Sequence, residues 1–184
     1  MFLAETNNAS IAGNLLGDFV KGKLDGEYPE EIQHGILMHR KIDSFTDRHS
    51  IILETAALLD QRFGRFRGIM LDIFFDYLLA INFYKYSDRD LVTFAGDVYN
   101  KLKMEWAILP ADVKFVVDMM IQHDWLSGYA HIENIKRALW HTSTRSKRMP
   151  DLSSGIIDLQ AKIVPLTKSF NAFFPELITF TKTL

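Results

Sequence analysis

The chain has 184 residues, contains no cysteine and carries a formal net charge of −2 at pH 7. This charge gives no overall attraction to nucleic acid or to a membrane surface, and the lack of cysteine excludes disulfides, thiolate nucleophiles and thiolate metal sites. With 48% apolar and 12% aromatic residues at this length, we expect one globular domain over residues 1–184.

Neither the first residues of the chain nor its most apolar stretch resembles a targeting or membrane segment. The first residues lack a basic region followed by an apolar run, so no signal peptide is indicated. The strongest apolar run, residues 68–83, is interrupted by Asp72 and Asp76 and is shorter than the roughly 20 residues of a membrane span. We therefore expect a soluble, cytoplasmic protein.

Apolar residues recur at helical spacing nearly everywhere, and no stretch alternates strictly between apolar and polar residues. This pattern predicts an all-α bundle of about eight helices. Ser10 is the expected cap of the first helix, and Pro29 opens the second. The expected helices cover residues 10–23, 29–47, 51–63, 66–83, 87–108, 110–123, 131–144 and 151–174, with a short segment after Pro175.

One row of side chains on the second expected helix changes from apolar to ionisable. Ile32 and Ile36 begin the row, and steps of three and four continue it to His39, Asp43 and Asp47. Ionisable groups that point inward need a partner or a cation, and a His/Asp row suits a divalent metal. The alternative is a core helix with a solvated, charged last turn.

A second pair of acids lies in the expected helix 66–83, whose apolar residues cover every face and predict a central, buried helix. Asp72 and Asp76 are one turn apart in it. Carboxylates in such surroundings require compensation. Either they pair with Arg40 or another base, or they face the His39 row across a metal.

A His/Asp cluster without cysteine favours a catalytic metal over a structural zinc site. Such a metal activates water and binds a phosphoryl oxygen, so phosphoester hydrolysis is the expected reaction class. The absence of a glycine-rich phosphate loop and of a Gly-x-Ser-x-Gly motif disfavours nucleotide kinases and serine hydrolases. The cations that we expect to bind phosphate are Arg40, Lys41, Arg145 and Arg148.

Four segments resemble the acyl carrier protein phosphodiesterases, and the resemblance extends over nearly the whole chain. The segments are Asn14-Leu-Leu-Gly-Asp-Phe-Val-Lys-Gly22, Gly35-Ile-x-x-His-Arg-x-Ile-Asp-x-Phe-Thr-Asp-x-His49, Asp72-Ile-x-x-Asp-Tyr-x-Leu-Ala80 and Phe170-x-x-Phe-Phe-Pro-Glu-Leu177. The resemblance implies an all-helical variant of the HD phosphohydrolase fold. It also implies manganese-dependent removal of phosphopantetheine from holo acyl carrier protein, which leaves the apo protein.

By the same resemblance, the family's functional residues fall on named positions of this chain. The implied metal-binding and water-activating set is Asp18, His39, Asp43 and Asp76. Asp47, Asp72 and Tyr77 would lie next to this set and hydrogen-bond to its members. Carboxylates in such positions orient an imidazole and raise its basicity. Arg40 is the implied phosphate ligand. The expected metal is Mn²⁺, with Mg²⁺, Fe²⁺ and Zn²⁺ as alternatives because they overlap in carboxylate and imidazole sites.

Two positions depart from the family pattern. Family members usually carry a histidine near the N-terminus in a Leu-Ala-His context, whereas Leu3-Ala4 is followed here by Glu5. Many members have Asp-His on the central helix, whereas this chain has Asp76-Tyr77. A neutral tyrosine binds metal poorly but can hydrogen-bond a phosphate. The dipeptide His123-Asp124 resembles the pair that names the HD hydrolases, but we expect a helix-end role for it.

Carrier proteins are acidic, so a basic surface is expected near the site. The candidate residues are Lys136, Arg137, Arg145, Lys147 and Arg148. Their alternative role is that of a solvated helix face and loop. Two other functions stay open: hydrolysis of a nucleotide or another small phosphodiester, and a helical module that binds carrier protein without catalysis.

Overall fold

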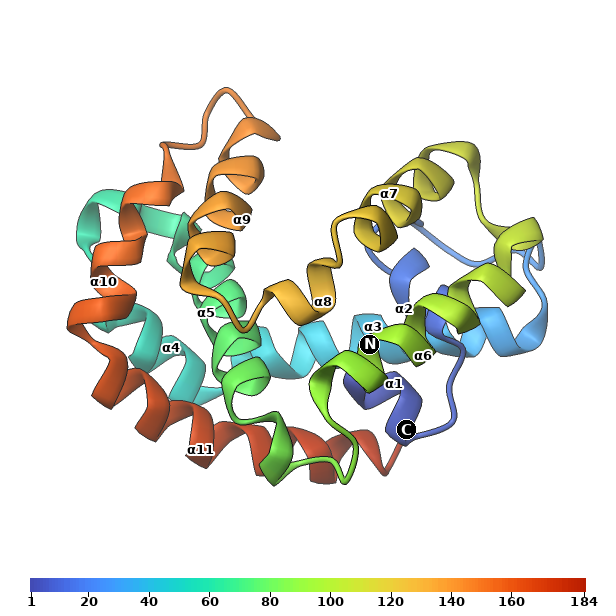
Figure 1. The fold of residues 1–184 in the computed structure, drawn as a ribbon, viewed down its shortest axis with the longest axis horizontal. Coiled ribbons are helices and arrows are strands. Elements are labelled where there is room, and N and C mark those ends of the chain that lie inside the picture. The colour runs from blue at the N-terminus through green and yellow to red at the C-terminus, as the bar shows by residue number, and fades with distance from the viewer. The chain divides into compact units, whose positions relative to one another are not determined.

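The computed structural model describes residues 1–184 and contains no β-strand (Figure 1). The all-α prediction is confirmed. Eleven α-helices form the structure: α1 (Phe2–Thr6), α2 (Ile11–Leu16), α3 (Glu30–Arg48), α4 (Ser50–Leu58), α5 (Arg67–Ile81), α6 (Leu91–Met104), α7 (Ala111–Gln122), α8 (Trp125–Gly128), α9 (Ile132–Thr144), α10 (Ile156–Ala161) and α11 (Ile163–Thr181). Four 3-10 helices accompany them: η1 (Gln61–Phe66), η2 (Phe83–Lys85), η3 (Trp106–Ile108) and η4 (Leu152–Gly155).

The helices outnumber the eight expected because several expected helices are divided and two short ones were not foreseen. The first expected helix ends early, at Leu16, although Ser10 caps it as predicted by accepting a 2.8 Å hydrogen bond from Gly13 N. The helix expected from residue 87 begins after Asp90, whose side chain accepts from Thr93 N. The expected break at Pro175 is wrong, because Pro175 lies inside α11.

The residues group into two compact units, each built from separate segments of the chain. The first unit contains residues 1–46, 89–126 and 176–184, and the second contains residues 47–88 and 127–175. Since the chain enters and leaves each unit more than once, neither unit is a consecutive stretch of sequence.

In the first unit, α2 crosses α3 with their backbones in contact. A Cβ atom added to Gly35 would lie 2.8 Å from Ser10 O and 2.9 Å from Asn14 N, and one added to Gly13 would lie 3.1 Å from Gly35 Cα. Only glycine permits such an approach. The carboxylate of Glu105, at the end of α6, accepts from Ser10 Oγ at 2.9 Å and from Ala12 N at 3.1 Å. This anion therefore fixes the N-terminus of α2 against α6.

In the second unit, α5 packs against α4 and α9, and η4 lies against α9 (Figure 1). Phe74, Met70, Leu71 and Leu78 of α5 are fully buried. Ser143 Oγ of α9 accepts a hydrogen bond from Leu152 N at 3.1 Å, which joins η4 to the helix. These contacts form the core of the second unit.

One buried carboxylate connects two segments of the second unit. Asp158, 8% exposed, accepts from Asp60 N at 2.7 Å and from Lys162 Nζ at 2.7 Å. We expect Asp158→Ala to lower the free energy of unfolding by about 1–3 kcal/mol, because a buried amide and an ammonium lose their acceptor. Urea denaturation measures this, with the exposed loop variant Asp25→Ala as control. Equal stability of the two variants would contradict the assignment.

Candidate functional site

His39 of α3 lies between two carboxylates of the first unit. Its Nε2 atom is 3.1 Å from Asp43 Oδ2, one turn further along α3, and 3.6 Å from Asp18 Oδ1, which follows α2. The imidazole side chain is 18% exposed, whereas the side chains of Asp18 and Asp43 are 66% and 59% exposed. The structure thus brings together three of the predicted residues, in an imidazole flanked by two carboxylates that solvent reaches. We call these three residues the His39 trio.

The segment after α2 brings Asp18 to this position. Asp18 N, Phe19 N and Val20 N donate hydrogen bonds back to Leu15 O and Leu16 O, so the chain turns tightly as the helix ends. Arg40 of α3 holds the same segment: Nη2 donates to Val20 O and Nη1 donates to Gly22 O, both at 2.8 Å. In this structure the predicted phosphate ligand therefore binds backbone carbonyls.

The prediction of an inward-pointing row on α3 is correct only as far as His39. Ile32 and Ile36 are fully buried and His39 is partly buried, but Asp43 and Asp47 are exposed. The helix runs out of the core after its third turn, so its last acidic residues face water. For Asp47, the alternative interpretation of a solvated, charged last turn is therefore correct.

Asp76 and the supporting residues Asp72 and Tyr77 lie on α5 in the second unit. The prediction that both acids are buried is wrong, because both are exposed while Tyr77 is half-buried. Apolar residues do occupy most of α5, but Ile69, 37% exposed, lies with Asp72 and Asp76 on one solvent-facing strip. The all-round apolar pattern therefore concealed a narrow exposed face.

No group of three or more His, Asp or Glu side chains in the chain is arranged so that it could hold a metal ion. The His39 trio nevertheless has the donor types that a divalent cation takes, with one imidazole, two carboxylates and no thiolate. Its exposed carboxylates can turn about their own side-chain bonds. The residues therefore fit such an ion in kind, but their arrangement in this structure is not that of a metal site.

Glu5, which occupies the position where a family histidine is expected, forms ion pairs with Arg89 and Lys101. Its side chain is 7% exposed; Arg89 donates to both carboxylate oxygens, and Lys101 Nζ donates at 2.9 Å. Burial alone would raise the pKa of Glu5, but the hydrogen bonds from Arg89 and Lys101 outweigh it and hold that pKa below its usual 4.5. This carboxylate is committed to an ion-pair cluster.

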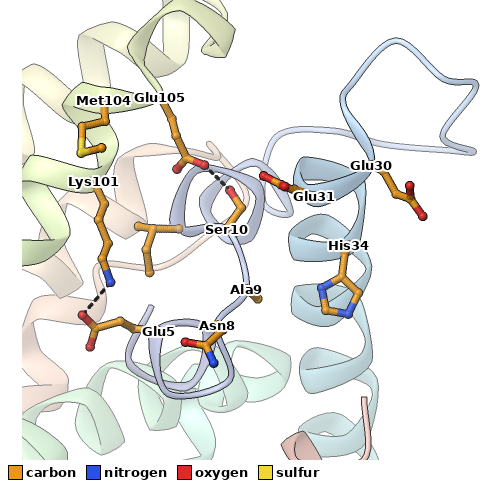
Figure 2. Close-up of a pocket in the computed structure, with 11 residues that line it drawn as sticks. Glu5, Asn8, Ala9, Ser10, Glu30, Glu31, His34, Lys101, Met104 and Glu105 are labelled. Carbon is orange, nitrogen blue, oxygen red and sulfur yellow. Dashed lines mark hydrogen bonds and ion pairs between the residues drawn. The ribbon is translucent and has the colours of Figure 1, made fainter.

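A cavity of about 600 Å³ opens beside this cluster in the first unit (Figure 2). Its wall includes Glu5 and Lys101 as well as Glu105, which binds Ser10. Glu30, Glu31 and His34 line it from the first turns of α3 (Figure 2). None of the predicted site residues lines the cavity, so it is separate from the His39 trio.

The His123-Asp124 pair lies at the end of α7, as expected. Asp124 has a positive φ of 44°, and its Oδ1 accepts a 3.0 Å hydrogen bond from Tyr99 Oη. The same hydroxyl accepts from Leu126 N at 2.9 Å. Burial, together with Asp124, raises the pKa of Tyr99. These contacts hold the turn after α7, so the pair has a helix-end role.

The predicted partner-binding residues all belong to α9 and the loop that follows it. Ile135 and Leu139 bury one face of α9, while the opposite face and the loop expose Lys136, Arg137, Arg145, Lys147 and Arg148. Residues 125–150 contain these five basic residues and one acidic residue, Glu133. The rest of the chain has 16 Lys and Arg against 22 Asp and Glu, so positive charge is concentrated here.

No helix of the structure has both the length and the apolar character needed to cross a membrane. No solved structure matches the chain, so the HD-like arrangement of helices stays a prediction.

Comparison with known proteins agrees with the motifs. A family model described as acyl carrier protein phosphodiesterase matches residues 1–177. The protein of that name from Yersinia enterocolitica is 29% identical over 180 residues, which cover 97% of this chain and 93% of the relative. Those from Photorhabdus laumondii and Pectobacterium atrosepticum are 27% and 28% identical, and cover 97% and 100% of this chain and 90% and 95% of the relatives.

We expect the contribution of Glu5 to the stability of the protein to depend on pH. Because its pKa is lowered on folding, Glu5 stabilises the protein above about pH 4.5 and loses this effect as the pH falls through the lowered pKa. We expect Glu5→Gln to cost about 1–2 kcal/mol at pH 7 and progressively less below pH 4. Thermal unfolding across this range tests it, with Glu54→Gln as an exposed control. A cost that persists undiminished at low pH would contradict it.

Proposed function

Because the chain belongs to the acyl carrier protein phosphodiesterase family, a family of phosphoric diester hydrolases, we propose that it releases 4′-phosphopantetheine from holo acyl carrier protein. The observation that supports this most directly is the His39 trio, in which an imidazole of α3 meets carboxylates from two elements in a solvent-accessible position. General acid and base groups that solvent reaches are one means of catalysing the hydrolysis of a phosphodiester.

The proposed reaction is attack of water on the phosphorus atom that joins phosphopantetheine to a serine oxygen of the carrier protein. A new P–O bond forms to water, the bond to the serine oxygen breaks, and the serine oxygen leaves with a proton. His39 and Asp43 are placed to take the proton from water, since Asp43 Oδ2 lies 3.1 Å from His39 Nε2 and solvent reaches both groups. Asp18 Oδ1 lies 3.6 Å from the same Nε2 atom and helps to orient the imidazole.

We further propose that Asp18, His39 and Asp43 hold a divalent cation, Mn²⁺ by the family resemblance, when their side chains turn toward it. Bound there, the cation would lower the pKa of water and neutralise a phosphoryl oxygen. Support comes from the donor chemistry and from the exposure of both carboxylates, 66% and 59%, which leaves them room to move. The role of Asp76, which lies on α5 in the second unit, stays a prediction.

For the carrier protein itself, we propose docking on the basic face of α9. Lys136 and Arg137 lie on it beside Trp140, which is 50% exposed. Tryptophan and arginine are the side chains that most often anchor protein interfaces, and positive charge steers an acidic partner toward its site. The face thus joins electrostatic attraction to an apolar anchor.

Replacement of Asp43 tests the hydrolytic centre. We expect Asp43→Asn to lower kcat for release of phosphopantetheine by at least 100-fold, since the amide cannot take a proton, and to weaken Mn²⁺ binding measured by calorimetry. The exposed loop variant Asp25→Asn serves as the matched control. Undiminished turnover in Asp43→Asn would remove the assignment.

The same assay separates the competing functions. Release of product from holo acyl carrier protein, but not from a panel of nucleotides and small phosphodiesters, supports the proposed substrate. The alternative is a module that binds carrier protein without catalysis. This alternative is favoured by Glu5, which replaces the family's N-terminal histidine and forms ion pairs with Arg89 and Lys101. Tight binding of holo carrier protein with no release by the wild-type chain would establish that alternative.

Charge reversal tests the docking face. We expect the double variant Lys136→Glu/Arg137→Glu to raise KM about tenfold at low salt with little change in kcat, because encounter with an acidic partner is slowed. Reversal of Lys103 and Lys182, two exposed lysines of the other unit, is the matched control. If KM and its salt dependence are the same in both double variants, the carrier protein docks elsewhere.

A further inference from the structure

Gly17 and His39 are packed so closely that a side chain at position 17 is excluded. A Cβ atom on Gly17 would lie closer than 3.0 Å to three atoms of the His39 side chain, a separation that real Cβ atoms essentially never show. The backbone of Gly17 is right-handed helical, with φ −52° and ψ −33°, so any residue could adopt its conformation. Glycine is therefore required here for space and not for backbone freedom.

The spacing of these contacts connects the site to the helix crossing. Gly13 contacts Gly35 where α2 crosses α3. Four residues further along each of the two segments, Gly17 contacts His39. One helical turn separates the two contacts on each side. The two segments therefore stay in close contact from the glycine crossing as far as the imidazole of His39.

Arg40 fixes the other end of the segment that carries Asp18. Its guanidinium spans the carbonyls of Val20 and Gly22, two residues apart, with both hydrogen bonds at 2.8 Å. A planar fork donates to two such acceptors from two separate nitrogen atoms, whereas lysine has a single nitrogen atom at the end of a flexible chain. Val20 N in turn donates to Leu16 O at 2.8 Å, so the segment is held from α2 and from α3.

We propose that Gly17 and Arg40 are positioning residues, which hold residues 17–22 against α3 so that Asp18 faces His39. This inference rests on the proposed function for its catalytic consequence, but the positioning itself exists without substrate. It differs from the role of phosphate ligand predicted for Arg40, because a ligand acts only when substrate is bound.

Gly17→Ala tests the space requirement. Alanine suits the backbone conformation, but its methyl group displaces the imidazole, and circular dichroism checks that the variant has the wild-type helical content. We expect kcat for phosphopantetheine release to fall at least tenfold while KM stays within twofold. Gly96→Ala is the matched control, since Gly96 lies in α6 with nothing within 4 Å of an added Cβ, and its kcat stays unchanged. Unchanged kcat in Gly17→Ala overturns the proposal for Gly17.

Arg40 is tested without substrate, by amide hydrogen exchange of Phe19 and Val20. We expect exchange at least tenfold faster in Arg40→Ala, and Arg40→Lys does not fully restore the wild-type rate because one nitrogen atom replaces the two that hold Val20 O and Gly22 O. Wild-type exchange in Arg40→Ala, with a raised KM that Arg40→Lys partly corrects, overturns the proposal and assigns Arg40 to the phosphate.

The activity assay and the exchange measurement distinguish failure of the proposed function from failure of the positioning proposal. If the wild-type chain releases no phosphopantetheine, the proposed function fails, and the exchange rates still decide whether Arg40 holds the segment. If the wild-type chain is active but neither variant changes exchange or kcat, the positioning proposal fails and the proposed function stands.

Discussion

The glycine-to-glycine crossing of α2 and α3 is the constraint on which the candidate site depends. Side chains normally keep helix axes 8–10 Å apart, and two glycines remove that spacing where Gly13 meets Gly35. Because α2 ends only one turn beyond the crossing, Asp18 follows at once and lies against α3. A wider crossing would separate Asp18 from His39, so the first step toward the site is a packing requirement and not an electrostatic one.

The acids of the first unit then divide into two kinds. Glu5 and Glu105 are held by structural partners, the first by Arg89 and Lys101 and the second by the N-terminus of α2. Asp18 and Asp43 are instead mostly exposed and lie beside an imidazole. A carboxylate whose oxygens accept hydrogen bonds from such partners stabilises the fold, whereas a mostly exposed carboxylate stays open to solvent. The cavity beside Glu5 and the His39 trio are accordingly separate places with different acids.

Local sequence patterns were sufficient for the helices and for part of the site. Helical spacing predicted the all-α class, and a step of four predicted that His39 and Asp43 share a face, because both follow from the geometry of a single helix. The exposed strip of Asp72 and Asp76 was missed because apolar residues surround it in sequence. The contacts of Arg40 with Val20 and Gly22, and of Gly17 with His39, join distant segments. Periodicity carries no information on such contacts, although the glycines within the matching motifs were a signal for close packing.

A double-mutant cycle between Asp18 and His39 tests most directly whether the two residues form one hydrolytic centre. Asp18→Asn, His39→Ala and the double variant would be compared by kcat/KM for release of phosphopantetheine from holo acyl carrier protein. Residues that act as a unit lose their function together, so the double variant should be scarcely slower than the worse single variant. If instead the two effects multiply, Asp18 and His39 act independently and the account of the site is wrong.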